Sequence, residues 1–199
     1  MRKSIVLIAA AALLAGCGGS TSTTAKTSTV ASPPASSAAT SGAAPTAEQT
    51  AWAGGVCTAT TTVKKDVQGL AAAVTSGGSN VSAAMSAQMA TIKTSATALV
   101  TAITAVPAGS ESDPEATAVK ASAGQFKSSI TALESSVATL QGKSGIAKVT
   151  ALTTVGSAAS DSLSKLGDTT LAIKNAAHDG KSTLGQAFAA APSCSSLTS

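Results

Sequence analysis

The chain of 199 residues is poor in the side chains that most often build stacking surfaces and active sites. It contains no tyrosine, one tryptophan and two phenylalanines, so aromatic residues make up only 2% of it. A platform on which sugars or bases stack needs several aromatic rings, so no such platform is expected. The single histidine, His178, cannot form a histidine-based metal site alone. It lies where a helix is expected to end, and a cation there interacts favourably with the helix dipole.

The sequence motifs of catalysis and nucleotide binding are also missing. His178 and Asp179 lack the G-x-S-x-G nucleophile elbow that would complete a hydrolase triad. No phosphate-binding P-loop and no dinucleotide-binding glycine motif occurs. An acidic cluster, Glu111, Asp113 and Glu115, is interpreted as helix-capping residues, with a cation site as the alternative. We therefore expect a non-enzymatic protein with no catalytic residues, no metal and no cofactor.

Cysteine is scarce, and the first of the three cysteines ends a recognisable leader. Arg2 and Lys3 precede an apolar run, Ile5 to Leu14, which is too short to span the roughly 30 Å of membrane hydrocarbon. The run closes on Leu14-Ala15-Gly16-Cys17, which resembles the lipobox of bacterial lipoproteins. The alternative is an ordinary secretory leader with a chance cysteine.

The resemblance implies that the thiol of Cys17 receives a diacylglyceryl group and that a type II signal peptidase removes residues 1–16. Two acyl chains suffice for stable anchoring, so the expected location is the extracytoplasmic face of the cell membrane. No other stretch approaches 18 uninterrupted apolar residues, and no transmembrane helix is expected after Cys17. The mature chain would keep 11 lysines and 9 acidic residues, a net charge of +2 that is too weak for a nucleic-acid partner.

Residues 17–45 are interpreted as a lipidated, disordered tether. After Cys17 they are Gly, Ser, Thr, Ala and Pro with one charge, Lys26, and one larger apolar residue, Val30. Such a composition has nothing to bury. Its mean reach is about 30 Å for a flexible chain of this length. The tether is either a plain spacer or an O-glycosylated stalk.

Residues 46–199 form the predicted domain, an all-α bundle. Helices are expected from Thr46 to about Ser76, from Asn80 to Val106, from about Asp113 to Gln141 and from Ile146–Val149 to Asp179. Thr46 and Gln49 have the spacing of a capping box. Gly54-Gly55 is a predicted weak point in the first helix. A β-rich fold is the rival interpretation, but no stretch alternates with a period of two for long.

Apolar residues repeat every seven positions in each predicted helix, which is typical of helices that supercoil around one another. The two predicted seams of each helix are Val56, Val63, Leu70 and Ala53, Thr60, Val67, Val74 in the first; Met85, Ile92, Leu99, Val106 and Met89, Ala96, Ile103 in the second; Val119, Phe126, Leu133, Leu140 and Ala116, Ala123, Ile130, Val137 in the third; and Leu152, Ala159, Leu166, Ile173 and Val149, Gly156, Leu163, Thr170 in the fourth. Four helices of this length with short links predict an up-down-up-down bundle.

The other two cysteines, Cys57 and Cys194, are expected to form a disulfide. In an up-down-up-down bundle the start of the first helix and the end of the fourth lie at the same end. A C-terminal tail (about Ser182 to Ala191, a short helix) then folds back to bring Cys194 to Cys57. Trp52 and Phe188 are expected beside the bridge. A redox-active pair is the disfavoured alternative, because the C-x-x-C spacing is absent.

Two hypotheses of function remain. The first is an interaction or structural module, with an envelope protein as partner, met at the glycine turns around residues 77–78 and 142–145. Small Ala/Thr-rich helical lipoproteins of actinobacteria, whose function is unassigned, are similar in composition and in the spacing of Trp52 and Cys57. The second is a carrier or binder of an apolar ligand such as a lipid, with Met85 and Met89 lining its site. At helical spacing on an apolar seam, such methionines are more often simple core residues. An apolar cavity above about 300 Å³ would favour the second hypothesis.

Overall fold

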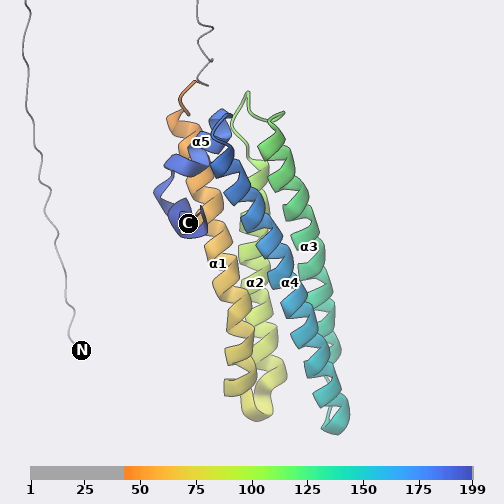
Figure 1. The fold of residues 1–199 in the computed structure, drawn as a ribbon. Coiled ribbons are helices and arrows are strands. Elements are labelled where there is room, and N and C mark those ends of the chain that lie inside the picture. The colour runs from red at the N-terminus through yellow and green to blue at the C-terminus, as the bar shows by residue number, and fades with distance from the viewer. Residues whose placement is uncertain (1–42, 199) are drawn as a thin grey trace, which may run out of the picture. The chain divides into compact units, whose positions relative to one another are not determined.

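The computed structural model describes residues 43–198, and this part of the chain is helical and contains no strand (Figure 1). The all-α prediction is therefore confirmed. The helices are α1 (Ala47–Gly77), α2 (Val81–Thr104), α3 (Pro114–Leu140), α4 (Gly145–Asp179), α5 (Thr183–Ala190) and α6 (Ser195–Thr198), with 3₁₀ turns η1 (Gly78–Asn80) and η2 (Pro192–Cys194). The predicted leader, the lipidation site Cys17 and the tether up to residue 42 lie outside the described residues.

The start of α1 has the predicted capping box. The Thr46 side chain accepts a hydrogen bond from the Gln49 backbone N–H (3.1 Å), and the Gln49 side-chain oxygen accepts one from the Thr46 N–H (2.8 Å). The Gln49 amide also donates to Ser110 Oγ (2.8 Å) and to Thr183 Oγ1 (3.3 Å). One side chain thus caps its own helix and joins it to the loop before α3 and to α5.

The other helix boundaries differ from prediction in detail. Helix α2 ends at Thr104, so Val106 follows the helix instead of continuing its seam. At the start of α3 the Asp113 side chain makes no capping hydrogen bond, contrary to its predicted role. Gly180 follows α4 with a φ of 59°, a left-handed conformation that favours glycine and ends the helix there as expected.

The long helices associate in pairs. Helix α1 packs mainly against α2, α3 packs mainly against α4, and α2 joins the pairs through α3. Between α1 and α2, the Trp52 indole N–H donates to the Ala102 carbonyl (2.8 Å) and the Gln88 amide donates to the Asp66 carbonyl (2.7 Å). The turns near Gly78 and Gly142 lie at the end away from α5 (Figure 1).

The seams predicted for α2 and α3 are buried, apart from Val106. On α3 all eight predicted seam residues are at most 6% exposed: Ala116, Val119, Ala123, Phe126, Ile130, Leu133, Val137 and Leu140. On α1 the predicted seams are buried as far as Leu70, but Val74 is 39% exposed. Burial of these apolar faces supplies the main stabilisation of helices whose many serines and threonines lower intrinsic helicity.

One seam predicted for α4 is wrong by one residue. Val149 is 64% exposed, and the buried series is instead Val155, Ser162, Thr169 and Ala176. Two polar residues can occupy this series because their hydroxyls are satisfied within the helix. Ser162 Oγ donates to the Ala158 carbonyl (2.9 Å), and Thr169 Oγ1 donates to the Lys165 carbonyl (3.2 Å). The pattern of large apolar residues therefore misplaced the buried face.

Candidate functional site

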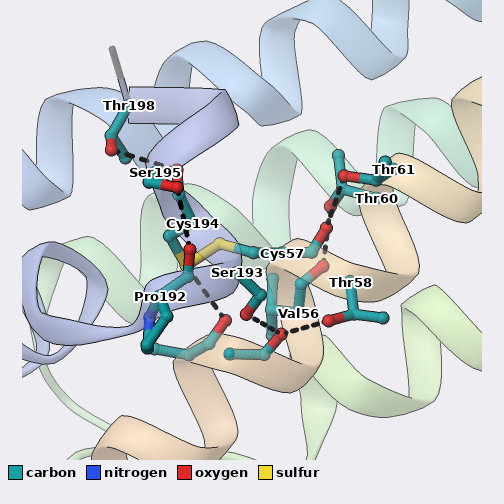
Figure 2. Close-up of a disulfide and its surroundings, with 12 residues drawn as sticks. Val56, Cys57, Thr58, Thr60, Thr61, Pro192, Ser193, Cys194, Ser195 and Thr198 are labelled. Carbon is teal, nitrogen blue, oxygen red and sulfur yellow. Dashed lines mark hydrogen bonds between the residues drawn. A yellow bond between two sulfur atoms is a disulfide. The ribbon is translucent and has the colours of Figure 1, made fainter. Parts of the chain in front are cut away.

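The disulfide between Cys57 and Cys194 is formed, as predicted (Figure 2). It joins residues 137 positions apart, with a Cα–Cα distance of 5.1 Å, and both cysteines are fully buried. Helix α5 begins at the cap residue Ser182, whose hydroxyl accepts a hydrogen bond from the Gly185 N–H (2.9 Å). The C-terminal tail therefore returns to α1 through a short helix and a covalent link.

Gly54 makes room for this tail and does not interrupt the helix. Helix α1 runs without a break through Gly54-Gly55, contrary to the predicted weak point. The Gly54 carbonyl accepts a hydrogen bond from Ser193 Oγ (2.9 Å), and a Cβ on Gly54 would lie 3.2 Å from that oxygen. A side chain at this position would crowd Ser193, so the glycine permits the close approach of the tail.

Trp52 and Phe188 contact each other at this end of the domain. Their ring centroids are 5.2 Å apart with an angle of 59° between the planes. Tilted pairs of this kind are favourable beyond their buried area. The Phe188 side chain is fully buried. The disulfide end is therefore a packed structural clasp with both of its sulfur atoms withdrawn from solvent.

An apolar groove lies between α1 and α4, where these two helices are not each other's main partner. Its volume is about 460 Å³. Most of the lining is aliphatic or small, and it consists of Val67, Gln68, Leu70, Ala71, Val74, Met85, Leu152, Val155, Gly156, Ala159, Ser160 and Leu163. We call this the distal groove.

The distal groove explains the face of α4 that was predicted to be core. Gly156 and Leu163, which belong to the wrongly placed seam, line the groove; Leu163 is only partly buried and packs against the edge of the core. Gly156 is exposed and has nothing within 4 Å of the position of an added Cβ. Because α4 turns its buried stripe mainly toward α3, its other apolar face is left open beside α1.

The two methionines proposed as ligand-lining residues do not share a site. Met85 is 1% exposed and forms part of the distal groove. Met89 is 5% exposed and lines a separate depression of about 340 Å³ between α2 and α3, beside Val137. The Lys93–Glu134 ion pair (2.7 Å) lies at that second depression. Only Met85 therefore belongs to the candidate apolar site.

A second groove adjoins the first along α1 and α4. It has a volume of about 490 Å³ and shares Gln68 and Leu163 with the distal groove. Its charged lining residues are Lys64 and Lys174, and Leu197 of the tail contributes to its wall. We call this the proximal groove. Neither groove is lined by an aspartate or a glutamate.

The acidic cluster of Glu111, Asp113 and Glu115 lies in the loop before α3 and at the start of that helix. A Glu111 carboxylate oxygen accepts a hydrogen bond from the Gly109 N–H (2.9 Å). Desolvation by burial, and secondarily the nearby Glu115 carboxylate, raises the pKa of Asp113 above its ordinary 3.8. Within residues 43–198, no group of three or more His, Cys, Asp or Glu side chains is placed to hold a metal ion.

Comparisons with protein-family models, with curated proteins and with solved structures found no match. Among the helices of residues 43–198, none has the length and apolar character needed to cross a membrane. A helical fold by itself implies no activity, so the grooves and the sequence motifs are the features that bear on function.

Proposed function

We propose that this protein is a membrane-anchored lipoprotein of the cell envelope and that its helical domain is a non-enzymatic module that binds an apolar ligand. The distal groove is the observation that supports binding. Its volume of about 460 Å³ lies within the range of about 300–1,000 Å³ that is usual for small-molecule sites, and its lining is mostly apolar. A ligand that covers such side chains gains roughly 25 cal/mol per Å² of apolar surface removed from water.

Gly156 offers a direct test of the groove. Gly156 lines the groove and an added Cβ there meets nothing within 4 Å, so we expect leucine at this position to be accommodated and to occupy part of the groove. Gly124 of α3 is the matched control, because it is also an exposed helical glycine with nothing within 4 Å of an added Cβ. Neither substitution removes a contact, and both replace glycine by a better helix former.

The measurement is titration with an uncharged hydrophobic fluorophore, N-phenyl-1-naphthylamine, using the chain from residue 17 onward with Cys17 replaced by serine. We expect saturable binding by this parent chain and by Gly124→Leu, and at least a tenfold weaker affinity for Gly156→Leu. Equal binding by all three chains, or no binding by the parent, would refute the groove as a ligand site.

The proposed anchor has its own test in cells. Cys17 is the acceptor that the lipobox implies, whereas Cys57 and Cys194 are bonded to each other. A culture fed an alkyne-tagged fatty acid should label the wild-type protein and not Cys17→Ser, and globomycin should cause the uncut precursor to accumulate. Labelling of the Cys17→Ser protein would contradict the anchor.

The proposal includes an up-down-up-down arrangement of α1 to α4. Contacts between α2 and α3 support it, because the residue numbers of the contacting side chains increase along α2 as they decrease along α3. That order is expected of two antiparallel helices. The Gln141 amide donates to Ser86 Oγ (3.0 Å), and Lys93 pairs with Glu134 (2.7 Å). Carbodiimide treatment should link Lys93 to Glu134, as detected by peptide mass spectrometry. Efficient linkage of Lys93 to Glu115 instead would indicate a different pairing.

An interaction with an envelope protein is the second candidate. Ile146 and Val149, at the start of α4, are 86% and 64% exposed, and they lie near the Gly142–Gly145 turn where a partner was expected. A photo-crosslinking residue at position 146 should then capture one discrete envelope protein in intact cells. A crosslinking residue at Lys120, on α3, is the control. Identical patterns from both positions would count against a docking site.

A further inference from the structure

The two grooves adjoin along α1 and α4 and have chemically different linings. They share Gln68 and Leu163 as lining residues, and we call the two together the α1–α4 cleft. The distal groove contains no charged residue, whereas Lys64 and Lys174 line the proximal groove. Polarity therefore changes along the α1–α4 cleft from hydrocarbon-like to cationic.

The distal groove has the length of one acyl chain. On α4 it extends from Leu152 to Leu163, which is about 16 Å at 1.5 Å per residue. Each leaflet of a bilayer contributes about half of the roughly 30 Å hydrocarbon thickness, so one lipid chain occupies about 15 Å. A volume of about 460 Å³ fits a single chain better than the two chains of a diacyl lipid.

The positively charged lysine side chains of the proximal groove favour a ligand with an anionic head group. Lys64 is exposed, and none of the described carboxylates pairs with it. A cationic side chain beside an apolar groove, with no carboxylate in the lining, complements an acidic head group. Lysine acts as a point charge and pairs with a carboxylate or a phosphate alike, so the choice of head group rests on its size. A small carboxylate head is the simplest complement to this end.

We propose that the α1–α4 cleft binds a long-chain fatty acid, with its acyl chain in the distal groove and its carboxylate beside Lys64. This inference rests on the proposed function, because it specifies which apolar ligand the module takes. No covalent step is involved, and the fatty acid is held by burial of its chain and by attraction to its head.

The test compares two ligands of equal chain length, palmitate and the uncharged hexadecanol, as competitors of bound N-phenyl-1-naphthylamine. Both are used below their aggregation concentrations at neutral pH and low ionic strength. Lys64→Gln removes the charge that lines the cleft, and Lys65→Gln is the matched control, because Lys65 is also exposed but does not line either groove. Gly156→Leu blocks the distal groove in the same series.

We expect palmitate to compete more strongly than hexadecanol with the parent chain. Lys64→Gln should weaken palmitate by about two- to fivefold, as expected for one solvent-exposed charge pair, and leave hexadecanol unchanged. Lys65→Gln should match the parent for both ligands, and 0.5 M salt should reduce the preference for palmitate because exposed charges are screened.

The outcomes separate this inference from the proposed function. If both ligands compete equally, and Lys64→Gln changes neither, the apolar site stands and the fatty-acid inference is overturned. If lysophosphatidylglycerol competes better than palmitate, the anionic head is a phosphate and the fatty acid is the wrong ligand. If neither palmitate nor hexadecanol competes, or if Gly156→Leu leaves both unaffected, the distal groove is not the site and both proposals fail.

Discussion

Replacing Cys57 and Cys194 together by alanine should lower the free energy of unfolding by about 3–5 kcal/mol. The bridge joins residues 137 positions apart, so it restricts most of the domain in the unfolded state. The chain-entropy relation for a loop of that size corresponds to about 17 cal/mol/K, or about 5 kcal/mol at 25 °C, which is an upper value because residual structure reduces it. With a urea dependence of about 2 kcal/mol/M, the unfolding midpoint should fall by about 1.5–2.5 M.

The assay is urea unfolding of the Cys17→Ser chain with and without the bridge, followed by two probes. Far-ultraviolet circular dichroism reports mainly on the four long helices. Fluorescence of Trp52, the only tryptophan, reports on its contact with Phe188 in the tail. Because Leu184, Ala187 and Phe188 are fully buried, the tail should stay packed without the bridge, and both probes should show one coincident transition.

Two results would refute this reasoning. A midpoint within about 0.3 M of the parent would mean that the bridge does not restrict the unfolded chain as its loop length requires. A fluorescence transition well below the circular dichroism transition would mean that the tail is an independent unit, held to α1 by the disulfide and little else. Reduction of the parent with dithiothreitol in urea should reproduce the double variant.

Three further predictions follow from single residues. Val155→Ala should lower the free energy of unfolding by about 1–3 kcal/mol, whereas Val149→Ala should change it by no more than about 0.5 kcal/mol, because Val155 is 1% exposed and Val149 is 64% exposed. Equal losses for the two variants in urea unfolding would support the seam first predicted from the sequence. Trp52→Phe should cost about 1–2 kcal/mol by removing an indole N–H that donates to an α2 carbonyl (2.8 Å); an unchanged melting temperature would contradict this. Burial, and secondarily Glu115, raises the pKa of Asp113 above its ordinary 3.8, so its contribution to stability is present below pH 3.8 and is lost as the pH rises through the folded-state pKa. Asp113→Asn should therefore be more stable than the parent at pH 7 and lose that advantage near pH 3; the same difference at both pH values would exclude titration of Asp113 as the cause.

Sequence reasoning succeeded where large apolar residues and capping signals agreed. The seam residues of α3, from Ala116 to Leu140, are large or small apolar residues in strict seven-residue order, and all are buried. The capping box of Thr46 and Gln49 depends on contacts within one turn, so it forms as predicted. Both signals depend on residues close together in the chain, and the tertiary packing agrees with them.

Two of the errors have a common origin in small residues. Ser162 and Thr169 resemble surface residues in a sequence, but each satisfies its hydroxyl within α4 and can face the core. Gly54 resembles a helix breaker, but its missing side chain accommodates Ser193. A small residue permits another segment of the chain to approach the helix closely, but the sequence alone does not identify that segment.

By itself the amino-acid order established a helical domain, most of its boundaries and the pairing of Cys57 with Cys194, because periodicity, caps and cysteine number act locally or by simple count. The α1–α4 cleft depended on tertiary packing. Helix α4 carries apolar residues on two adjoining faces, and which face is buried depends on how closely it packs against α3. That choice buries Val155 and leaves Gly156 and Leu163 to line an open groove. A shift of one residue around the helix axis separates the buried face of α4 from the face that lines the groove, and only the neighbouring helices determine which is which.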